Sequence, residues 1–148
     1  MPQSLADIVV HLVFSTKNRM PFVPEEQLPR HFEYLAGTLR GLDSDAIIVG
    51  GRPDHVHLMF RQSRIHAISK IVEEVKKQSS QWAKTMLHPE FYWQAGYGVF
   101  SVSSSKVAEV KQYILNQKEH HQIRTFQEEY RLLLEKHGLV WDERYVWD

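Results

Sequence analysis

His55 and His57 are the pair of residues in this sequence best placed to bind one metal ion together. They lie in an apolar run, residues 55–60, whose alternation predicts a β-strand. Alternate side chains of a strand leave the same face, so the two imidazoles would stand about 7 Å apart at their Cα atoms and could share an ion. A chain with 9 histidines in 148 residues contains roughly half an H-x-H match by chance, so this pair alone is weak evidence. The opposite face of the strand would carry Val56, Leu58 and Phe60.

Tyr113 and Gln117 form a second candidate pair. Their spacing of four places them on one face of a predicted helix, about 6 Å apart along its axis, where they could address one substrate together. The alternative is that Tyr113 joins Val110 and Ile114 in an ordinary amphipathic stripe, with Gln117 at its border. This pattern, too, needs independent support.

Hydrophobic periodicity and turn residues indicate the elements that must position these side chains. We expect strands at residues 8–14, 46–49, 55–60 and 97–102. We expect helices at residues 25–40 and 66–87, a long helix after serines 103–105 that continues beyond His121, and a last helix at 126–136. The order β-α-β-β-α-β is that of the split βαβ, ferredoxin-like plan of the α+β class. It predicts an antiparallel sheet with helices mainly on one face, plus a C-terminal helical extension.

Length and composition are typical of one folded domain. The 148 residues are 43% hydrophobic and 24% charged, which predicts a single domain over residues 1–148 with a core at 1–124 and a helical tail at 125–148. The sequence has no cysteine, which excludes disulfides, thiol nucleophiles and thiolate metal sites. Any metal must therefore use histidine, carboxylate or amide ligands.

The charges are balanced but unevenly distributed. The chain has 18 basic and 18 acidic residues; residues 1–124 carry a net charge of +3 and residues 125–148 a net charge of −3. An acidic tail of this kind is typical of a solvated segment, and charge alone does not identify a ligand. No apolar run approaches the ~20 residues of a membrane span, and residues 1–5 lack a charged-then-apolar leader. We therefore expect a cytoplasmic protein with no membrane partner.

Four ordered blocks of the sequence carry a resemblance to a known family. They read HLVFSTKNR (residues 11–19), VGGRPDHVHL (49–58), WQAGYGVFSVS (93–103) and YILNQKEHH (113–121). These blocks resemble the HUH single-tyrosine transposases, the small insertion-sequence transposases and REP-associated tyrosine transposases. The C-terminal EEY at residue 128 and DERYVWD at residue 142 resemble the end of some members. The resemblance extends over nearly the whole chain.

The resemblance implies roles for particular residues. Tyr113 would be the nucleophile, and His55, His57 and Gln117 would bind a divalent metal, Mg²⁺ or Mn²⁺. His121 is an alternative third ligand. By its position before His55, Asp54 could orient that imidazole, although an aspartate after Pro53 often only shapes the turn. The implied substrate is single-stranded DNA with hairpins, cleaved through a 5′-phosphotyrosine by a homodimer with no nucleotide cofactor.

Basic and aromatic side chains near the expected cleft are candidates for DNA contacts. The basic candidates are Lys17, Arg19, Arg52, Lys76, Lys77, Lys106 and Lys111. Tyr92, Trp93 and Tyr97 could stack on bases, although the same residues could instead be solvated charges and core aromatics.

Two other functions are compatible with parts of the pattern. A histidine-based nucleotide phosphohydrolase also places alternating histidines on a strand, but its third histidine position here is Met59. A ferredoxin-like sheet is also a common platform for nucleic acid, so a non-catalytic binding module derived from a transposase is the second alternative.

Overall fold

A four-stranded antiparallel sheet forms the middle layer of the protein. The computed structural model describes residues 2–148. The strands are β1 (Val9–Ser15), β2 (Ala46–Arg52), β3 (His55–Arg61) and β4 (Gly98–Val102). Their order across the sheet is β2-β3-β1-β4, and every pairing is antiparallel. This arrangement confirms the α+β, ferredoxin-like fold, and each strand lies within a few residues of its expected position.

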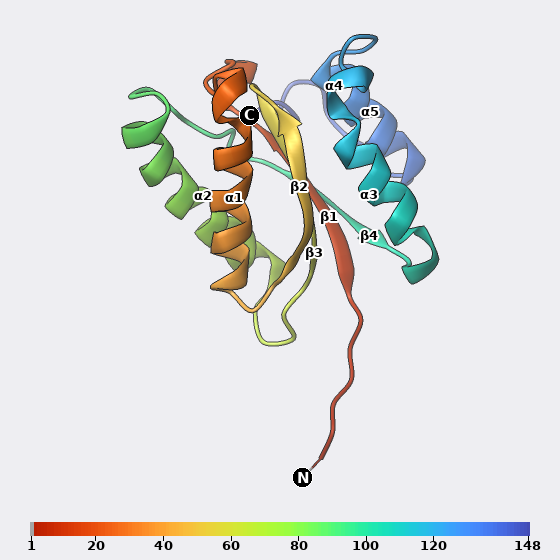
Figure 1. Cartoon of the computed structure of the whole chain (residues 1–148). Coiled ribbons are helices and arrows are strands. Elements are labelled where there is room, and N and C mark those ends of the chain that lie inside the picture. Colours follow the sequence, from red (N-terminus) through yellow and green to blue (C-terminus); the bar gives the residue numbers. More distant parts are fainter. Residues whose placement is uncertain (1) are drawn as a thin grey trace.

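Helices cover both faces of the sheet (Figure 1). One face carries α1 (Leu28–Arg40) and α2 (Ile68–Met86), the two crossover helices of the split βαβ plan. The C-terminal extension folds over the other face as α3 (Val107–Leu115), α4 (Gln117–His120) and α5 (Phe126–Lys136). Single 3₁₀ turns lie at Lys17–Arg19, Glu25–Gln27 and Ser104–Lys106.

The alternation of β3 divides its side chains between two cores. Val56, Leu58 and Phe60 belong to the main apolar core, which they share with α1 and α2. Met59 belongs to a smaller core with Val9 of β1 and Ile114 of α3. His55 and His57 share the Met59 face, because side chains two apart on a strand point the same way. The strand therefore presents both histidines to the C-terminal helices, as the periodicity predicts.

The expected long helix after serines 103–105 is instead two helices. α3 ends at Leu115, Asn116 leaves the helical conformation with φ −92° and ψ 24°, and α4 begins at Gln117. Asparagine has a low helix propensity because its side chain competes for nearby backbone groups. Its Oδ1 accepts from the side-chain Nε2 of Gln112, one turn earlier, at 3.2 Å. The break makes α4 a single short turn, and the chain then reverses into α5.

The C-terminal residues 125–148 are packed against the sheet rather than fully solvated. Thr125 and Glu128 begin α5 with a capping box, in which each side chain bonds to the other residue's backbone N–H. Phe126, Tyr130 and Leu134 then pack with Val13 and Phe100 of the sheet. The expectation of a solvated acidic tail is wrong for α5, whose Glu129 is only 2% exposed.

Within residues 2–148, no helix combines the length and the apolar character that crossing a membrane requires.

His31 of α1 is buried in the main core without a polar partner. Neither ring nitrogen has a hydrogen bond, and the ring stacks between aromatic side chains, with centroids 5.6 Å from Trp93 and 6.2 Å from Trp82. Burial lowers the pKa of His31 to about 4, because a charged imidazole is poorly solvated there.

We expect His31 to make the fold sensitive to acid. The pKa of His31 is lower in the folded protein than in the unfolded chain. The free energy of unfolding should therefore be unaffected by His31 above pH 6.5 and should decrease as the pH falls from 6.5 towards 4. The loss should reach about 3 kcal/mol. Urea unfolding of the wild type and of His31→Phe at pH 7.5 and pH 4.5 measures it. The variant should lose less stability than the wild type, and equal losses would contradict this account.

Candidate active site

A buried carboxylate lies at the centre of the polar residues on the C-terminal face. Glu129 of α5 accepts at Oε1 from His57 Nε2 (2.9 Å), and His121 Nε2 lies 3.2 Å from the same oxygen. Its other oxygen, Oε2, accepts from the hydroxyl of Tyr113 and from Gln117 Nε2 (3.0 Å). Elements that are distant in sequence therefore meet on one side chain.

His55 is held between two oxygens. Its Nδ1 lies 2.7 Å from Asp54 Oδ1, and its Nε2 lies 2.9 Å from Gln117 Oε1. The His55 side chain is buried, whereas that of Asp54 is 30% exposed. Asp54 therefore contacts the first imidazole of the H-x-H pair directly.

His57 has a second contact, with a histidine that sequence reasoning did not single out. His11 of β1 lies with its Nε2 2.8 Å from His57 Nδ1, and the two rings are stacked 5.0 Å apart. A neutral His57 has one ring proton: if Nε2 donates to Glu129, Nδ1 accepts from His11, and if Nε2 binds a cation, Nδ1 donates to His11. His11 therefore orients the ring of His57.

Burial and the neighbouring charges set the ionisation of this cluster. Burial alone would raise the pKa of the Glu129 carboxyl, but His57 and the hydrogen bond from His121 lower it below its usual value. Burial lowers the pKa of His57. Burial and then the Glu129 charge raise the pKa of the Tyr113 hydroxyl. The carboxylate is thus ionised, and the phenol that donates to it is protonated.

Close contact between a strand and a helix positions Tyr113. Gly50 of β2 is buried against α3, and a Cβ at Gly50 would lie 2.8 Å from both the side chain and the carbonyl oxygen of Ile114. Only glycine allows the backbone of α3 to come this near. Ile114 immediately follows Tyr113, so this contact determines how far the Tyr113 side chain lies from the sheet.

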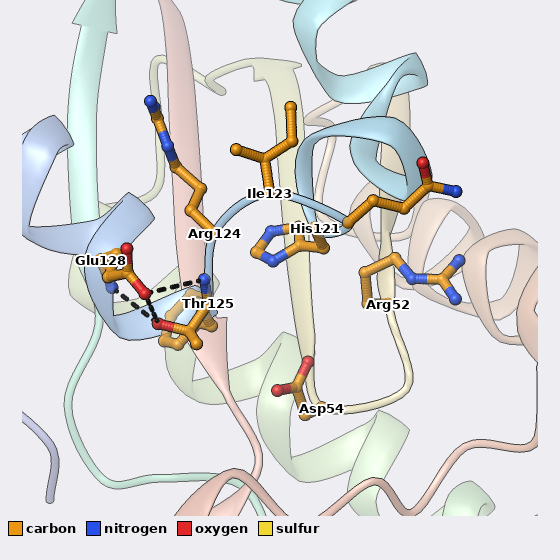
Figure 2. A pocket seen from close by; sticks show the side chains of 9 residues that line it. Arg52, Asp54, His121, Ile123, Arg124, Thr125 and Glu128 are labelled. Atoms are coloured by element: carbon orange, nitrogen blue, oxygen red, sulfur yellow. Dashed lines mark hydrogen bonds between the residues drawn. The ribbon is translucent and has the colours of Figure 1, made fainter.

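An open cavity of about 370 Å³ lies beside the cluster. His121 and Asp54 line it, and the Asp54 carboxylate lies below the His121 ring in Figure 2. Arg52 and Arg124 add positive charge to its wall. Glu128 and Asp54 line the same wall, so the cavity is an open route to the cluster with charges of both signs.

The predicted basic residues do not gather at this cavity as a group. Lys17, Lys77 and Lys111 are exposed, Arg52 forms an ion pair with Glu25, and Lys106 pairs with Glu109 at 3.2 Å. Arg19 donates to the carbonyl of Trp147 at 3.0 Å.

Lys76 of α2 has a different environment from the other predicted DNA contacts. Its Nζ donates to the carbonyls of Gln94, Ala95 and Gly96 at 2.7, 3.1 and 2.7 Å. Burial lowers its pKa to about 8. The ammonium thus holds the loop before β4 in place.

Glu129 is the main residue of the cluster that the sequence analysis missed. The sequence does contain a pattern that indicates Glu129. This residue is three positions after Phe126 and one before Tyr130, on the face of α5 that carries its buried apolar residues. A carboxylate on such a face needs a buried partner.

His55, His121 and Glu129 offer donor atoms that all lie within 4.8 Å of one another, a spacing that suits a metal ion.

Comparison with known proteins identifies the family. The family described as "Transposase IS200 like" matches residues 4–117. The chain belongs to the IS200-like transposase family. No curated protein matches this transposase in sequence.

Two solved structures share the fold of this IS200-like transposase. A candidate transposase from Deinococcus radiodurans R1 is 23% identical, with a TM-score of 0.63 over 79% of this chain and 95% of that one. A REP-associated tyrosine transposase bound to a REP hairpin is 15% identical, with a TM-score of 0.61 over 82% of this chain and 72% of that one.

We expect the close contact at Gly50 to be essential for the packing of α3 in this transposase. Gly50→Ala should lower the free energy of unfolding by about 1–3 kcal/mol, because the new methyl group has no room against α3. The control is Gly37→Ala in α1, where a Cβ meets nothing within 4 Å. That variant should gain about 0.5–1 kcal/mol. Urea unfolding measures both, and a Gly50→Ala protein as stable as the wild type would contradict the close approach.

Proposed function

We propose that this transposase cleaves and rejoins single-stranded DNA through Tyr113, by way of a 5′-phosphotyrosine. The observation that supports this proposal best is that the Tyr113 hydroxyl and the imidazole of His57 contact the same Glu129 carboxylate. A nucleophile and an H-x-H pair thus come together within one chain. We propose that each site is assembled from the residues of one subunit, which this contact within one chain supports.

The donor atoms around His55 fit a divalent cation. If the Nδ1–H of His55 donates to Asp54, its Nε2 presents a lone pair. That lone pair faces Gln117 Oε1 at 2.9 Å, and Gln117 uses its amide N–H on Glu129. Two acceptors at this distance repel unless a cation or a proton lies between them. We propose His55, His57 and Gln117 as ligands of Mg²⁺ or Mn²⁺, with His121 as the alternative third ligand.

A bound divalent ion would stabilise the negative charge that develops on the phosphate oxygens during attack. The remaining chemistry belongs to the chain. The Tyr113 hydroxyl gives up its proton to the Glu129 carboxylate that accepts its hydrogen bond, or to water, and its oxygen forms the new bond to phosphorus. The bond from phosphorus to the 3′ oxygen breaks, and that oxygen gains a proton and leaves as a 3′-hydroxyl. Rejoining reverses these steps with a 3′-hydroxyl as nucleophile. The ester to Tyr113 retains the energy, so no nucleotide cofactor is needed.

Several observations support hairpin-bearing single strands as the substrate. The REP-associated relative is described as bound to a REP hairpin. In this chain the cavity beside the cluster is open and carries Arg124, together with Arg52, which is paired with Glu25, and arginines of this kind suit a phosphate backbone. The other basic candidates, a homodimeric state and a single domain over residues 1–148 remain predictions.

The two alternative functions have weaker support. Met59 is fully buried and packs in an apolar cluster with Ile114, so it supplies no third imidazole for a phosphohydrolase. A binding module without catalysis has no use for a phenol hydrogen-bonded into a buried carboxylate–imidazole cluster.

We expect Tyr113 to be the residue that joins covalently to DNA. With Mn²⁺ or Mg²⁺, the protein should form an adduct with labelled single strands that carry the palindromes flanking its reading frame, seen as a shifted band in a denaturing gel. Tyr113→Phe should form none, because it lacks the attacking oxygen. The control is Tyr145→Phe, which removes an exposed hydroxyl and should leave the adduct unchanged. An adduct on Tyr113→Phe would refute the assigned nucleophile.

A further inference from the structure

Glu129 enters the site from a part of the chain that the family match does not include. The match ends at residue 117, whereas Glu129 belongs to α5. The two oxygens of its carboxylate have separate partners. Oε1 faces the imidazoles of His57 and His121, and Oε2 accepts from Tyr113 and Gln117.

The distances from Glu129 and Gln117 to the imidazoles are close to those between ligands of one ion. His55, His121 and Glu129 have donor atoms that all lie within 4.8 Å of one another. Bonds of about 2.1 Å set at right angles place neighbouring ligand atoms about 3 Å apart. Glu129 Oε1 lies 2.9 Å from His57 Nε2 and 3.6 Å from His55 Nε2. His55 Nε2 lies 2.9 Å from Gln117 Oε1.

We propose that Glu129 is an additional, anionic ligand of the metal and that its second oxygen positions the Tyr113 hydroxyl. This inference rests on the proposed function, since it requires a metal at His55 and His57. It adds a charge that those ligands lack, because imidazoles and an amide are neutral when they bind a cation. Mg²⁺ and Mn²⁺ favour carboxylate oxygens. A buried carboxylate, in turn, requires a cation or several donors near it.

The packing of α5 fixes Glu129 before any ligand arrives. Phe126 and Tyr130, on either side of it, are both buried against the sheet. A Cβ at Gly98 of β4 would lie 2.7 Å from the Tyr130 ring, so the helix sits as close to the strand as glycine allows. The carboxylate is therefore a preorganised part of the site, and the C-terminal helix contributes directly to the metal centre.

The test is the affinity of the full-length protein for Mn²⁺, measured by isothermal titration calorimetry without DNA. Glu129→Gln keeps the size of the side chain and removes its charge, and should weaken Mn²⁺ binding by about 10- to 100-fold. Glu135→Gln removes an exposed charge from the same helix and is the matched control, with unchanged affinity. Glu129→Asp keeps the carboxylate and should recover part of the loss. Circular dichroism confirms that each variant is folded.

The outcomes separate this inference from the proposed function. Wild type and Glu129→Gln with equal Mn²⁺ affinity would overturn the ligand role while leaving His55, His57 and Gln117 as the metal site. Equal affinity together with faster DNA cleavage by Glu129→Gln would mean that the carboxylate only occupies the place of a substrate phosphate. A wild type that binds no Mn²⁺ would overturn both this inference and the metal dependence of the proposed reaction.

Discussion

The burial of one negative charge is the constraint on which this structure depends. The Glu129 side chain is 2% exposed, and an ionised carboxylate in such a place is strongly destabilising unless donors or cations surround it. His57, Gln117 and Tyr113 supply those donors from β3, α4 and α3. The same hydrogen bonds that make the charge tolerable also bring the candidate nucleophile to the candidate metal ligands. The arrangement of β3, α3 and α4 that stabilises the buried carboxylate is therefore also the arrangement that the proposed reaction requires.

The sheet separates structural support from chemistry by the alternation of its strands. On one face, β1 and β3 pack apolar side chains against α1 and α2 and form the main core. On the other face, the same strands present His11, His55 and His57 to the C-terminal helices. Because a one-residue shift in register would exchange the two faces, the apolar core fixes the placement of the histidines. The Gly50 and Gly98 contacts then bring α3 and α5 close enough to meet them.

Local sequence patterns predict most of this fold and only part of the site. The alternation in residues 55–60 places His55 and His57 on one face, and the spacing of Tyr113 and Gln117 brings both to one carboxylate, even across the break at Asn116. Glu129 lies 72 residues from His57, and periodicity within one helix carries no information about a partner so distant. Lys76 shows the same limit, because its ammonium holds three carbonyls of a loop about twenty residues away.

Anomalous X-ray diffraction from crystals grown with Mn²⁺ tests the central claim most directly. The account predicts one strong peak within bonding distance of His55, His57 and Glu129 of the same chain, with Tyr113 still beside the carboxylate. A peak that these three residues do not share, or a Glu129 side chain that has turned into solvent while the metal is bound, would contradict it.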